Sequence, residues 1–173
     1  MEKHPILEFI DRLPFFKEFS EDEKSKLVNT AGIFEKFKDG ETIISEGDDG
    51  AALFVVLTGS IEITKSTVAP VKEGHISLQE PENITIAELK GGSIFGEISL
   101  ISNRPRNTSA HATSAQVVVM KITKEIIEHF NLAIQKKFQA QLILILVQRL
   151  DDMNTKYINL KAAASKEQKK SPA

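Results

Sequence analysis

Residues 95–112 read FGEISLISNRPRNTSAHA, and this stretch constrains the fold and the chemistry of the chain more than any other. Glu97–Ile101 is long enough for one helical turn, whose first backbone amides have no partner inside the helix. A helix start of this kind attracts an anion, and Gly96 lets the backbone approach a ligand closely. The planar fork of Arg106 can bind two phosphate oxygens at once. The stretch therefore predicts a phosphate-binding site.

Glu97 is the unexpected member of this site, because a carboxylate beside a bound anion opposes binding. It fits if it faces another part of the ligand, and a ribose hydroxyl suits it. Each residue also has a purely structural interpretation: Phe95 in the core, Gly96 in a turn, Glu97 beside the positive end of a helix dipole and Arg106 in solvent. Taken singly, these are the commoner roles. Together, at this spacing, the residues indicate a binding site.

The stretch resembles the phosphate-binding cassette of the cyclic nucleotide-binding domain family, which reads Phe-Gly-Glu, a small apolar turn, then Pro-Arg and small residues. Residues 46–63 resemble a second block of that family, a glycine turn that leads into a strand and ends in Gly59 at a hairpin. Ala51 and Phe54 depart from the residues that are frequent in this block. The resemblance is continuous over about residues 37–122, and it continues into the helices beyond.

The resemblance implies that the ligand is a 3′,5′-cyclic nucleotide. Arg106 would pair with the cyclic phosphate, and Glu97 would accept a hydrogen bond from the ribose 2′-hydroxyl. The rest of the cassette supplies the other expected contacts: Phe95, the backbone amides of Gly96, Ser99 and Asn107, and walls formed by Ile98, Leu100 and Thr108. Asn107 stands where the family usually has Ala, Ser or Thr, with Thr associated with cyclic GMP. We expect cyclic AMP to be favoured, with cyclic GMP as the alternative, and a residue of the C-terminal helix to cap the base.

Composition and charge limit the other functions that the chain can have. Its 173 residues, 41% of them hydrophobic, suffice for one core and an appendage. The formal net charge of −2 gives no sign of general attraction to nucleic acid or to anionic membranes. The absence of cysteine excludes disulfides, iron–sulfur clusters and thiol catalysis. No signal peptide or apolar membrane span is recognisable. We expect a cytoplasmic protein with a nucleotide ligand but no cofactor, metal or membrane partner.

The beginning of the chain predicts helices. Residues 5–31 carry apolar side chains at helical spacing, and Pro14 interrupts them. Ser20 and Glu23 have the spacing of a capping box at the start of a second helix. The phenylalanines between the two helices, Phe15, Phe16 and Phe19, are expected to close one end of the core.

From Ile33 the sequence changes to short apolar runs separated by turn residues, which predicts several short antiparallel strands. Asp39-Gly40 between two such runs indicates a hairpin. Residues 66–83 are expected to form a long surface hairpin or loop, with no task assigned to it. The fold class is therefore predicted to be α+β, mainly β: an antiparallel β jelly-roll sandwich with N-terminal helices and a long C-terminal helix.

The chain is predicted to be helical from Thr123, a suitable N-cap, to near its end. Apolar residues there alternate by three and four positions, as in the seam of a coiled coil. These residues are Ile143, Leu146, Leu150, Met153, Tyr157 and Leu160. The alternative is a single helix buried on its own domain through an adjoining stripe, which Leu142 and Ile145 form. We expect a homodimer through the seam.

We expect four segments: N-terminal helices at 1–32, the nucleotide-binding barrel at 33–122, the hinge and long helix at 123–162, and a disordered tail at 163–173. No catalytic set of residues is visible, so the output is expected to be mechanical rather than enzymatic. In the family, the cassette contracts around the phosphate and moves the hinge helix, here about residues 123–130. An effector protein, which the sequence does not identify, would read that movement.

Three other interpretations remain open. A catabolite-activator-type transcription factor would continue into a helix-turn-helix domain, but the sequence ends too soon after Leu160, so we do not expect direct DNA binding. Either the protein works through a partner or the sequence is a fragment of a larger protein. A cupin-like metalloenzyme would need closely spaced histidines, and the four histidines here are scattered singly. A degenerate member of the family could keep the fold as a dimerisation module without a ligand, although the presence of both Glu97 and Arg106 argues against that.

Overall fold

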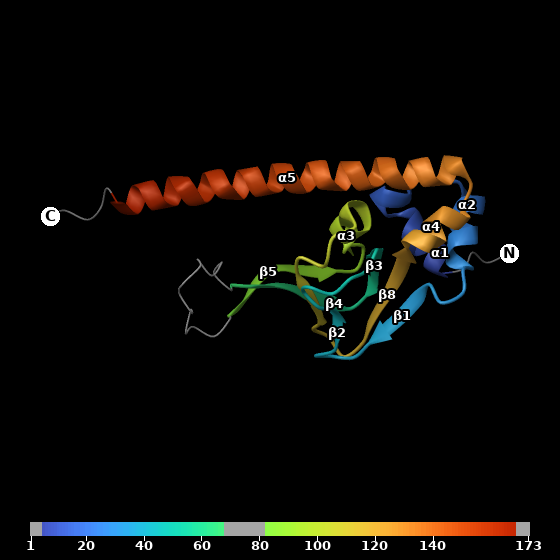
Figure 1. Cartoon of the computed structure of the whole chain (residues 1–173), viewed down its shortest axis with the longest axis horizontal. Coiled ribbons are helices and arrows are strands. Elements are labelled where there is room, and N and C mark those ends of the chain that lie inside the picture. Colours follow the sequence, from blue (N-terminus) through green and yellow to red (C-terminus); the bar gives the residue numbers. More distant parts are fainter. Residues whose placement is uncertain (1–4, 68–81, 169–173) are drawn as a thin grey trace.

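The structure is a computed structural model that describes residues 5–67 and 82–168. Two four-stranded sheets form a sandwich, with short helices packed at one end (Figure 1). A single long helix, α5, lies along one side of the molecule and extends past the end of β5. The chain passes through these helices and strands in the order α1 (Pro5–Asp11), η1 (Pro14–Phe16), α2 (Glu21–Val28), β1 (Phe34–Phe37), β2 (Thr42–Ile44), β3 (Ala52–Thr58), β4 (Ser60–Ser66), β5 (Asn83–Lys90), β6 (Ile94–Phe95), α3 (Glu97–Ser102), β7 (Ser109–Ala112), β8 (Val117–Thr123), α4 (Lys124–His129) and α5 (Leu132–Gln168).

The strand order confirms the predicted jelly roll. One sheet has the order β1-β8-β3-β6 and the other β2-β7-β4-β5, and every neighbouring pair is antiparallel. Consecutive strands therefore lie in opposite sheets, with the exception of β4 and β5, which pair directly. The N-terminal helices and the C-terminal helices α4 and α5 cover the outer face of the first sheet, so the predicted α+β class is confirmed as well.

Strand β3 explains why the sequence of this sheet is apolar at consecutive positions. Leu53, Val55 and Leu57 contact the core that the helices form, whereas Phe54 and Val56 face the core between the sheets. Side chains alternate between the two faces of a strand, so a strand with both faces covered needs no polar positions. The buried sheet thus holds the helices on one side and the second sheet on the other.

The turns at Asp39-Gly40 and Gly59 are not the hairpins that the sequence suggested. β1 and β2 belong to different sheets, and so do β3 and β4, so each turn carries the chain from one sheet to the other. Gly40 and Gly59 do adopt left-handed conformations, with φ of 80° and 84°. The local turn chemistry was identified, but the pairing of the flanking strands depends on core packing, which a turn does not determine.

The N-terminal helices follow the predicted pattern over shorter ranges. Ser20 Oγ accepts a hydrogen bond from the Glu23 amide at 3.3 Å, and Glu23 Oε2 accepts one from the Ser20 amide at 2.7 Å, which confirms the capping box. Phe15, Phe16 and Phe19 are buried in the helix-side core, as expected. Phe15 and Phe19 both contact the ring of Phe138 of α5.

Near the same helices, Thr123 caps α4 as predicted, with its hydroxyl accepting from the Ile126 amide. The expected disordered tail at 163–173 is wrong for its first part, because α5 continues to Gln168. The residues from Ala162 onward include alanines, lysine, glutamate and glutamine, all strong helix formers, so the helix has no local reason to stop at 162. Residues 169–173 lie outside the described residues.

Two details of the strands differ from the predictions. Strand β6, a two-residue strand that pairs with β3 through Phe54 and Phe95, was not predicted. A strand this short has no period to detect. The expected loop at 66–83 begins with Ser66 at the end of β4 and ends with Asn83 at the start of β5, and its centre, 68–81, lies outside the described residues.

Candidate functional site

A cavity of about 430 Å³ lies between the second sheet, the cassette and α5. The residues that line it come from three regions: the strands (Ile44, Ile63, Ile86, Ala87, Leu89), the cassette (Phe95, Gly96, Glu97, Ile98, Ser99, Arg106, Asn107, Thr108) and α5 (Arg149, Asp152, Met153, Lys156). The structure thus brings all of the cassette residues chosen from the sequence to one cavity, apart from Leu100. The strands and Met153 give it an apolar side, and the cassette gives it a polar one.

Leu100 does not form a wall of the cavity, contrary to the prediction. It is buried in the core between the helices and the first sheet. Successive residues of a helix point in directions about 100° apart, so α3 cannot present all of its apolar residues to one side. Ile98 and Ser99 line the cavity, and Leu100 instead anchors α3 to the domain.

Gly96 is the N-cap of α3 and adopts a left-handed conformation with φ of 79°. A Cβ atom at this position would lie 2.9 Å from Arg106 Nη1 and 3.0 Å from the Ala52 carbonyl oxygen. Both the φ angle and the lack of space therefore require glycine here. The consequence is that the guanidinium of Arg106 lies directly against the turn that starts the helix.

Glu97 is fully buried at the start of α3, with 0% of its surface exposed. Its Oε1 forms an ion pair with Nη1 of Arg149, which reaches it from α5. Nη2 of Arg149 also donates to the Ile94 carbonyl oxygen. The second carboxylate oxygen, Oε2, is buried and accepts no hydrogen bond from the residues that the structure describes. A buried acceptor without a donor is costly, so this atom marks a place for a ligand hydroxyl or amine.

Arg106 is held by its backbone before its side chain is considered. Its amide donates to the Asp48 carbonyl and its own carbonyl accepts from the Gly47 amide, both at 2.8 Å. The side chain is 7% exposed, and Nη1 donates to the carbonyl oxygens of Ala52 and Gly96 at 2.9 and 2.7 Å. Nε and Nη2 have no hydrogen-bond partner among the described residues. These free donors form the edge of the guanidinium that suits a bidentate phosphate.

Burial lowers the pKa of the Arg106 guanidinium, and the nearby Glu97 carboxylate opposes that shift. An arginine stays protonated in proteins despite such a shift. The guanidinium is also 5.7 Å from the centre of the Phe54 ring, which stacks on Phe95. The site therefore contains a positive charge whose position is fixed on several sides and whose solvation by water is reduced.

The end of the cassette is fixed by an ion pair from β4. Lys65 Nζ donates to the Asn107 carbonyl oxygen at 2.7 Å and pairs with the carboxylate of Glu46. The same carboxylate accepts from the Ser66 amide at 2.9 Å. The hydrogen bond from Lys65 and the one from Ser66 lower the pKa of Glu46. The peptide that follows Arg106 is therefore held in place by β4, through Lys65.

The sequence analysis did not identify the residues of α5 that line the cavity. It expected some residue of the long helix to cap the base, and four residues reach the cavity: Arg149, Asp152, Met153 and Lys156. Their spacing of three and four positions places them on one face of the helix. The spacing of these four residues is visible in the sequence. The apolar seam is the stronger pattern and shares Met153 with this face, so the sequence does not show which face of the helix meets the cassette.

Two features of the described residues bear on the other interpretations. No group of three or more histidine, cysteine, aspartate or glutamate side chains is placed so that it could hold a metal ion. Likewise, none of the helices within the described ranges has the length and apolar character that crossing a membrane requires.

Comparison with known proteins gives one family match and several relatives. The family model described as "Cyclic nucleotide-binding domain" matches residues 34–131. Human cGMP-dependent protein kinase 2 is 30% identical over 117 residues, which are 68% of this chain and 14% of the kinase. The cAMP-dependent protein kinase regulatory subunit of Dictyostelium discoideum is 27% identical over 100 residues, or 57% of this chain and 28% of that subunit. The chain thus spans a minor part of the length of these relatives.

Solved structures show the same fold. A cyclic nucleotide-binding domain from Methylobacillus flagellatus has a TM-score of 0.68 and 23% identity, with 89% of this chain and 81% of that one covered. The catabolite activator protein of Thermus thermophilus has a TM-score of 0.65 and 22% identity, with coverages of 86% and 63%. At these identities the likeness bears on the fold alone.

Proposed function

The chain belongs to the cyclic nucleotide-binding domain family, and from this we propose that it is a sensor for a 3′,5′-cyclic nucleotide, with cyclic AMP favoured over cyclic GMP. The ligand occupies the cavity beneath α5, and α5 passes the binding event to a partner protein. The observation that carries the proposal is the buried Oε2 of Glu97, which accepts no hydrogen bond from the described residues, in a residue that lines the same cavity as Arg106.

The phosphate end of the proposed complex lies between α3 and Arg106. Nε and Nη2 of Arg106 donate to the equatorial phosphate oxygens, and the amides at the start of α3 complete the contact. The side chain is held in part before the ligand arrives, because Nη1 already donates to the Ala52 and Gly96 carbonyls. A donor group that is ordered before binding loses less conformational entropy when the ligand arrives.

The sugar end of the complex lies at Glu97. The ribose 2′-hydroxyl donates to Oε2, while Oε1 keeps its ion pair with Arg149. The ligand thereby satisfies a buried acceptor that the protein leaves without a donor, which is favourable by about 1–3 kcal/mol. A 3′,5′-cyclic phosphodiester leaves the 2′-hydroxyl free to bind Glu97 while its phosphate binds Arg106, and both residues line the same cavity.

The base end is apolar on the sheet side and partly charged on the helix side. Ile86 and Leu89 of β5 line one side, and Met153 and Lys156 of α5 line the other. A purine ring fits between apolar walls, and Met153 is the α5 residue best suited to cover its face. Asn107 stands at the position that bears on the choice of base, and the absence of threonine there supports cyclic AMP.

A homodimer through α5 is part of the proposal. Ile143, Leu150, Met153 and Tyr157 of the predicted seam are exposed on one face of the helix, and Leu146 is half-buried. An apolar stripe of this spacing suits a second copy of the same helix. Sedimentation velocity at micromolar concentration should show a dimer, and a monomer throughout would contradict this part.

Isothermal titration with cyclic AMP, cyclic GMP and linear 5′-AMP tests the function. We expect saturable binding of one ligand per chain for the cyclic nucleotides, tighter for cyclic AMP, and at least tenfold weaker binding of the linear nucleotide, a difference of about 1.4 kcal/mol. The alternative is a ligand-free family member, favoured by the fact that Oε1 of Glu97 and Nη1 of Arg106 already have protein partners. That alternative predicts no saturable binding of any of the three.

A further inference from the structure

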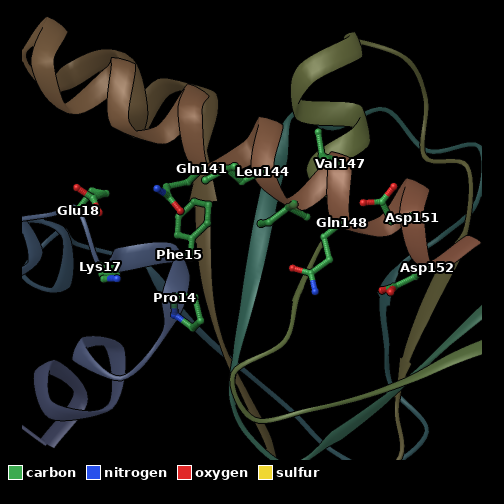
Figure 2. Close-up of a pocket in the computed structure, with 11 residues that line it drawn as sticks. Pro14, Phe15, Lys17, Glu18, Gln141, Leu144, Val147, Gln148, Asp151 and Asp152 are labelled. Atoms are coloured by element: carbon green, nitrogen blue, oxygen red, sulfur yellow. The ribbon is translucent and has the colours of Figure 1, made fainter.

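A groove of about 640 Å³ lies between η1 and α5. Figure 2 shows its two walls: Pro14 and Phe15 on one side, and the α5 residues from Gln141 to Asp152 on the other. Lys17 and Glu18 stand at its rim beyond Phe15. We propose that this groove, the η1–α5 groove, binds a basic amphipathic helix of a partner protein.

The apolar part of the groove has no cover in the chain itself. Leu144 and Val147 of α5 line it and are 59% and 52% exposed. They belong to a run of six apolar residues, Leu142–Val147, and a helix that is apolar all round is normally buried all round. Leu142 points into the domain core and Ile143 belongs to the dimer seam, so these two contacts leave Leu144 and Val147 free.

The η1–α5 groove and the dimer seam occupy adjoining faces of α5. With 100° between successive residues, Leu144, Val147 and Asp151 form a stripe of their own beside the seam residues Leu150 and Tyr157. A second copy seated on the seam would border Val147 and Asp151 but would leave Leu144 and the η1 wall of the groove open. This separation is the reason for assigning the groove to a different partner.

The charges at the rim determine the chemistry of that partner. Glu18, Asp151 and Asp152 line the groove, with Lys17 as the single opposing charge. Within the described ranges, none of these three carboxylates has an ion pair or a side-chain hydrogen bond. Their combined potential attracts a cationic partner. A helix with apolar residues on one face could pack them against Leu144 and Val147. Lysine or arginine residues beside that face could pair with the three carboxylates.

The groove is connected to the nucleotide site, which makes the docking sensitive to the ligand if the proposed function holds. Arg149, which pairs with Glu97, lies in the same helical turn as Gln148 and Asp151 of the groove wall. Asp152 lines both cavities. The opposite wall, η1, is fixed at a different place on α5, because Phe15 packs against Phe138 near the start of that helix. A ligand that shifts Arg149 therefore changes the width of the groove.

The test uses the full chain and a synthetic peptide with leucine at helical spacing and lysine at the other positions. In methyl NMR spectra we expect the shifts to be concentrated at Leu144 and Val147, and binding to weaken as salt rises. A peptide with glutamate in place of lysine should not bind. Shifts spread over the surface, or equal binding of the acidic peptide, would overturn the proposal.

Charge reversal gives the matched control. The double variant Glu18→Lys/Asp151→Lys should bind the basic peptide at least roughly tenfold more weakly. The variant Asp39→Lys/Glu88→Lys, with the same change of charge away from the groove, should bind it as the wild type does. Equal affinities of the two variants would refute the assignment, and so would a loss of self-association confined to the first variant, which would mean that a second copy occupies the groove.

Measurements with cyclic AMP distinguish a failure of this proposal from a failure of the proposed function. Both double variants should keep the wild-type affinity for cyclic AMP, because none of the four residues lines the nucleotide cavity. Saturating cyclic AMP should change the affinity of the wild type for the basic peptide. Peptide binding that is indifferent to bound nucleotide would overturn the coupling, whereas a chain that binds the peptide but no nucleotide would refute the proposed function alone.

Discussion

At the scale of single residues, the site depends on a glycine as much as on the charged side chains. Gly96 brings the Arg106 guanidinium and the Ala52 carbonyl within 3 Å of where a Cβ would be, and its φ of 79° disfavours any other residue. Gly40 has nearly the same φ, 80°, but open space around it. Substitution of Gly40 therefore measures the cost of the backbone conformation alone, and substitution of Gly96 measures that cost together with the cost of crowding the site.

Gly96→Ala and Gly40→Ala should differ in a defined way. Both place a Cβ in the left-handed region, which costs about 1–2 kcal/mol. Gly96→Ala must in addition displace Arg106, so we expect it to lose more free energy of unfolding in urea and also to lose affinity for cyclic AMP. Gly40→Ala should keep that affinity. Equal effects of the two substitutions on binding would contradict the close packing of Gly96 against Arg106.

The residues of the site differ in how far the sequence could identify them. Glu97 and Arg106 are close together in the cassette, and their separation carries the resemblance to the family. Arg149 is 52 positions from Glu97, the residue it pairs with, and its contact depends on the rotation of α5 about its axis. That rotation follows from the packing of Phe138 and Leu142 in the core, which no local pattern reveals. Glu97 was expected to bind a ligand alone, and the structure adds a protein partner.

At the scale of elements, α2 and α5 are joined by Glu23. Its carboxylate caps α2 and forms an ion pair with Lys137 of α5, with Nζ to Oε2 at 2.6 Å. The hydrogen bond from Lys137 and then the one from the Ser20 amide lower the pKa of Glu23. The pair is close to the surface, so its contribution to stability is small per charge.

The lowered pKa of Glu23 predicts a pH dependence with a definite sign. The unfolded chain binds a proton at Glu23 at a higher pH than the folded chain does, so the contribution is present above the ordinary glutamate pKa of about 4.3 and is lost as the pH falls through the folded value. Glu23→Gln should therefore lower the free energy of unfolding at pH 7 and have a smaller effect near pH 3.

Urea unfolding at the two pH values measures this difference, with Asp22→Asn as the control in the same helix. Asp22 pairs with the exposed Lys26 instead of with α5. A penalty for Glu23→Gln that is the same at both pH values would show that the charge of Glu23 does not act through Lys137.

Elements were predicted best where a local pattern suffices. The capping box at Ser20, the cap at Thr123 and the short apolar strands all follow from neighbouring residues. The hairpins at Gly40 and Gly59 were wrong, because the choice between pairing in one sheet and crossing to the other depends on which core each strand completes. The end of α5 was placed too early, since a polar composition was taken as disorder although its residues favour a helix.

At the scale of the whole molecule, α5 is anchored to the domain by its first turns and by Arg149. Its first turns are fixed by Phe138 and by Lys137, and its middle is tied to the cassette by Arg149. Both the nucleotide cavity and the η1–α5 groove have α5 as one wall. In the function that we propose, this helix moves about its first anchor when the second changes, and the ligand shifts the populations of the two positions by its difference in affinity for them.

Hydrogen exchange tests this movement. Saturation with cyclic AMP should change the exchange rates of amides in residues 123–160, with the larger change after Arg149, where the helix has left its first anchor. Amides of the buried strand β3 serve as the internal reference and should change less. Identical exchange throughout residues 123–160 with and without the ligand would contradict the proposal that α5 carries the signal.

The central claim is that Arg106 binds the phosphate of a cyclic nucleotide, and isothermal titration of Arg106→Ala with cyclic AMP tests it most directly. Removing a desolvated arginine from a phosphate costs about 2–5 kcal/mol, so the affinity should fall by roughly 30-fold or more. Arg104→Ala, which removes an exposed arginine two positions earlier that does not line the cavity, should bind as the wild type does. Folded Arg106→Ala protein with unchanged affinity for cyclic AMP would contradict the account.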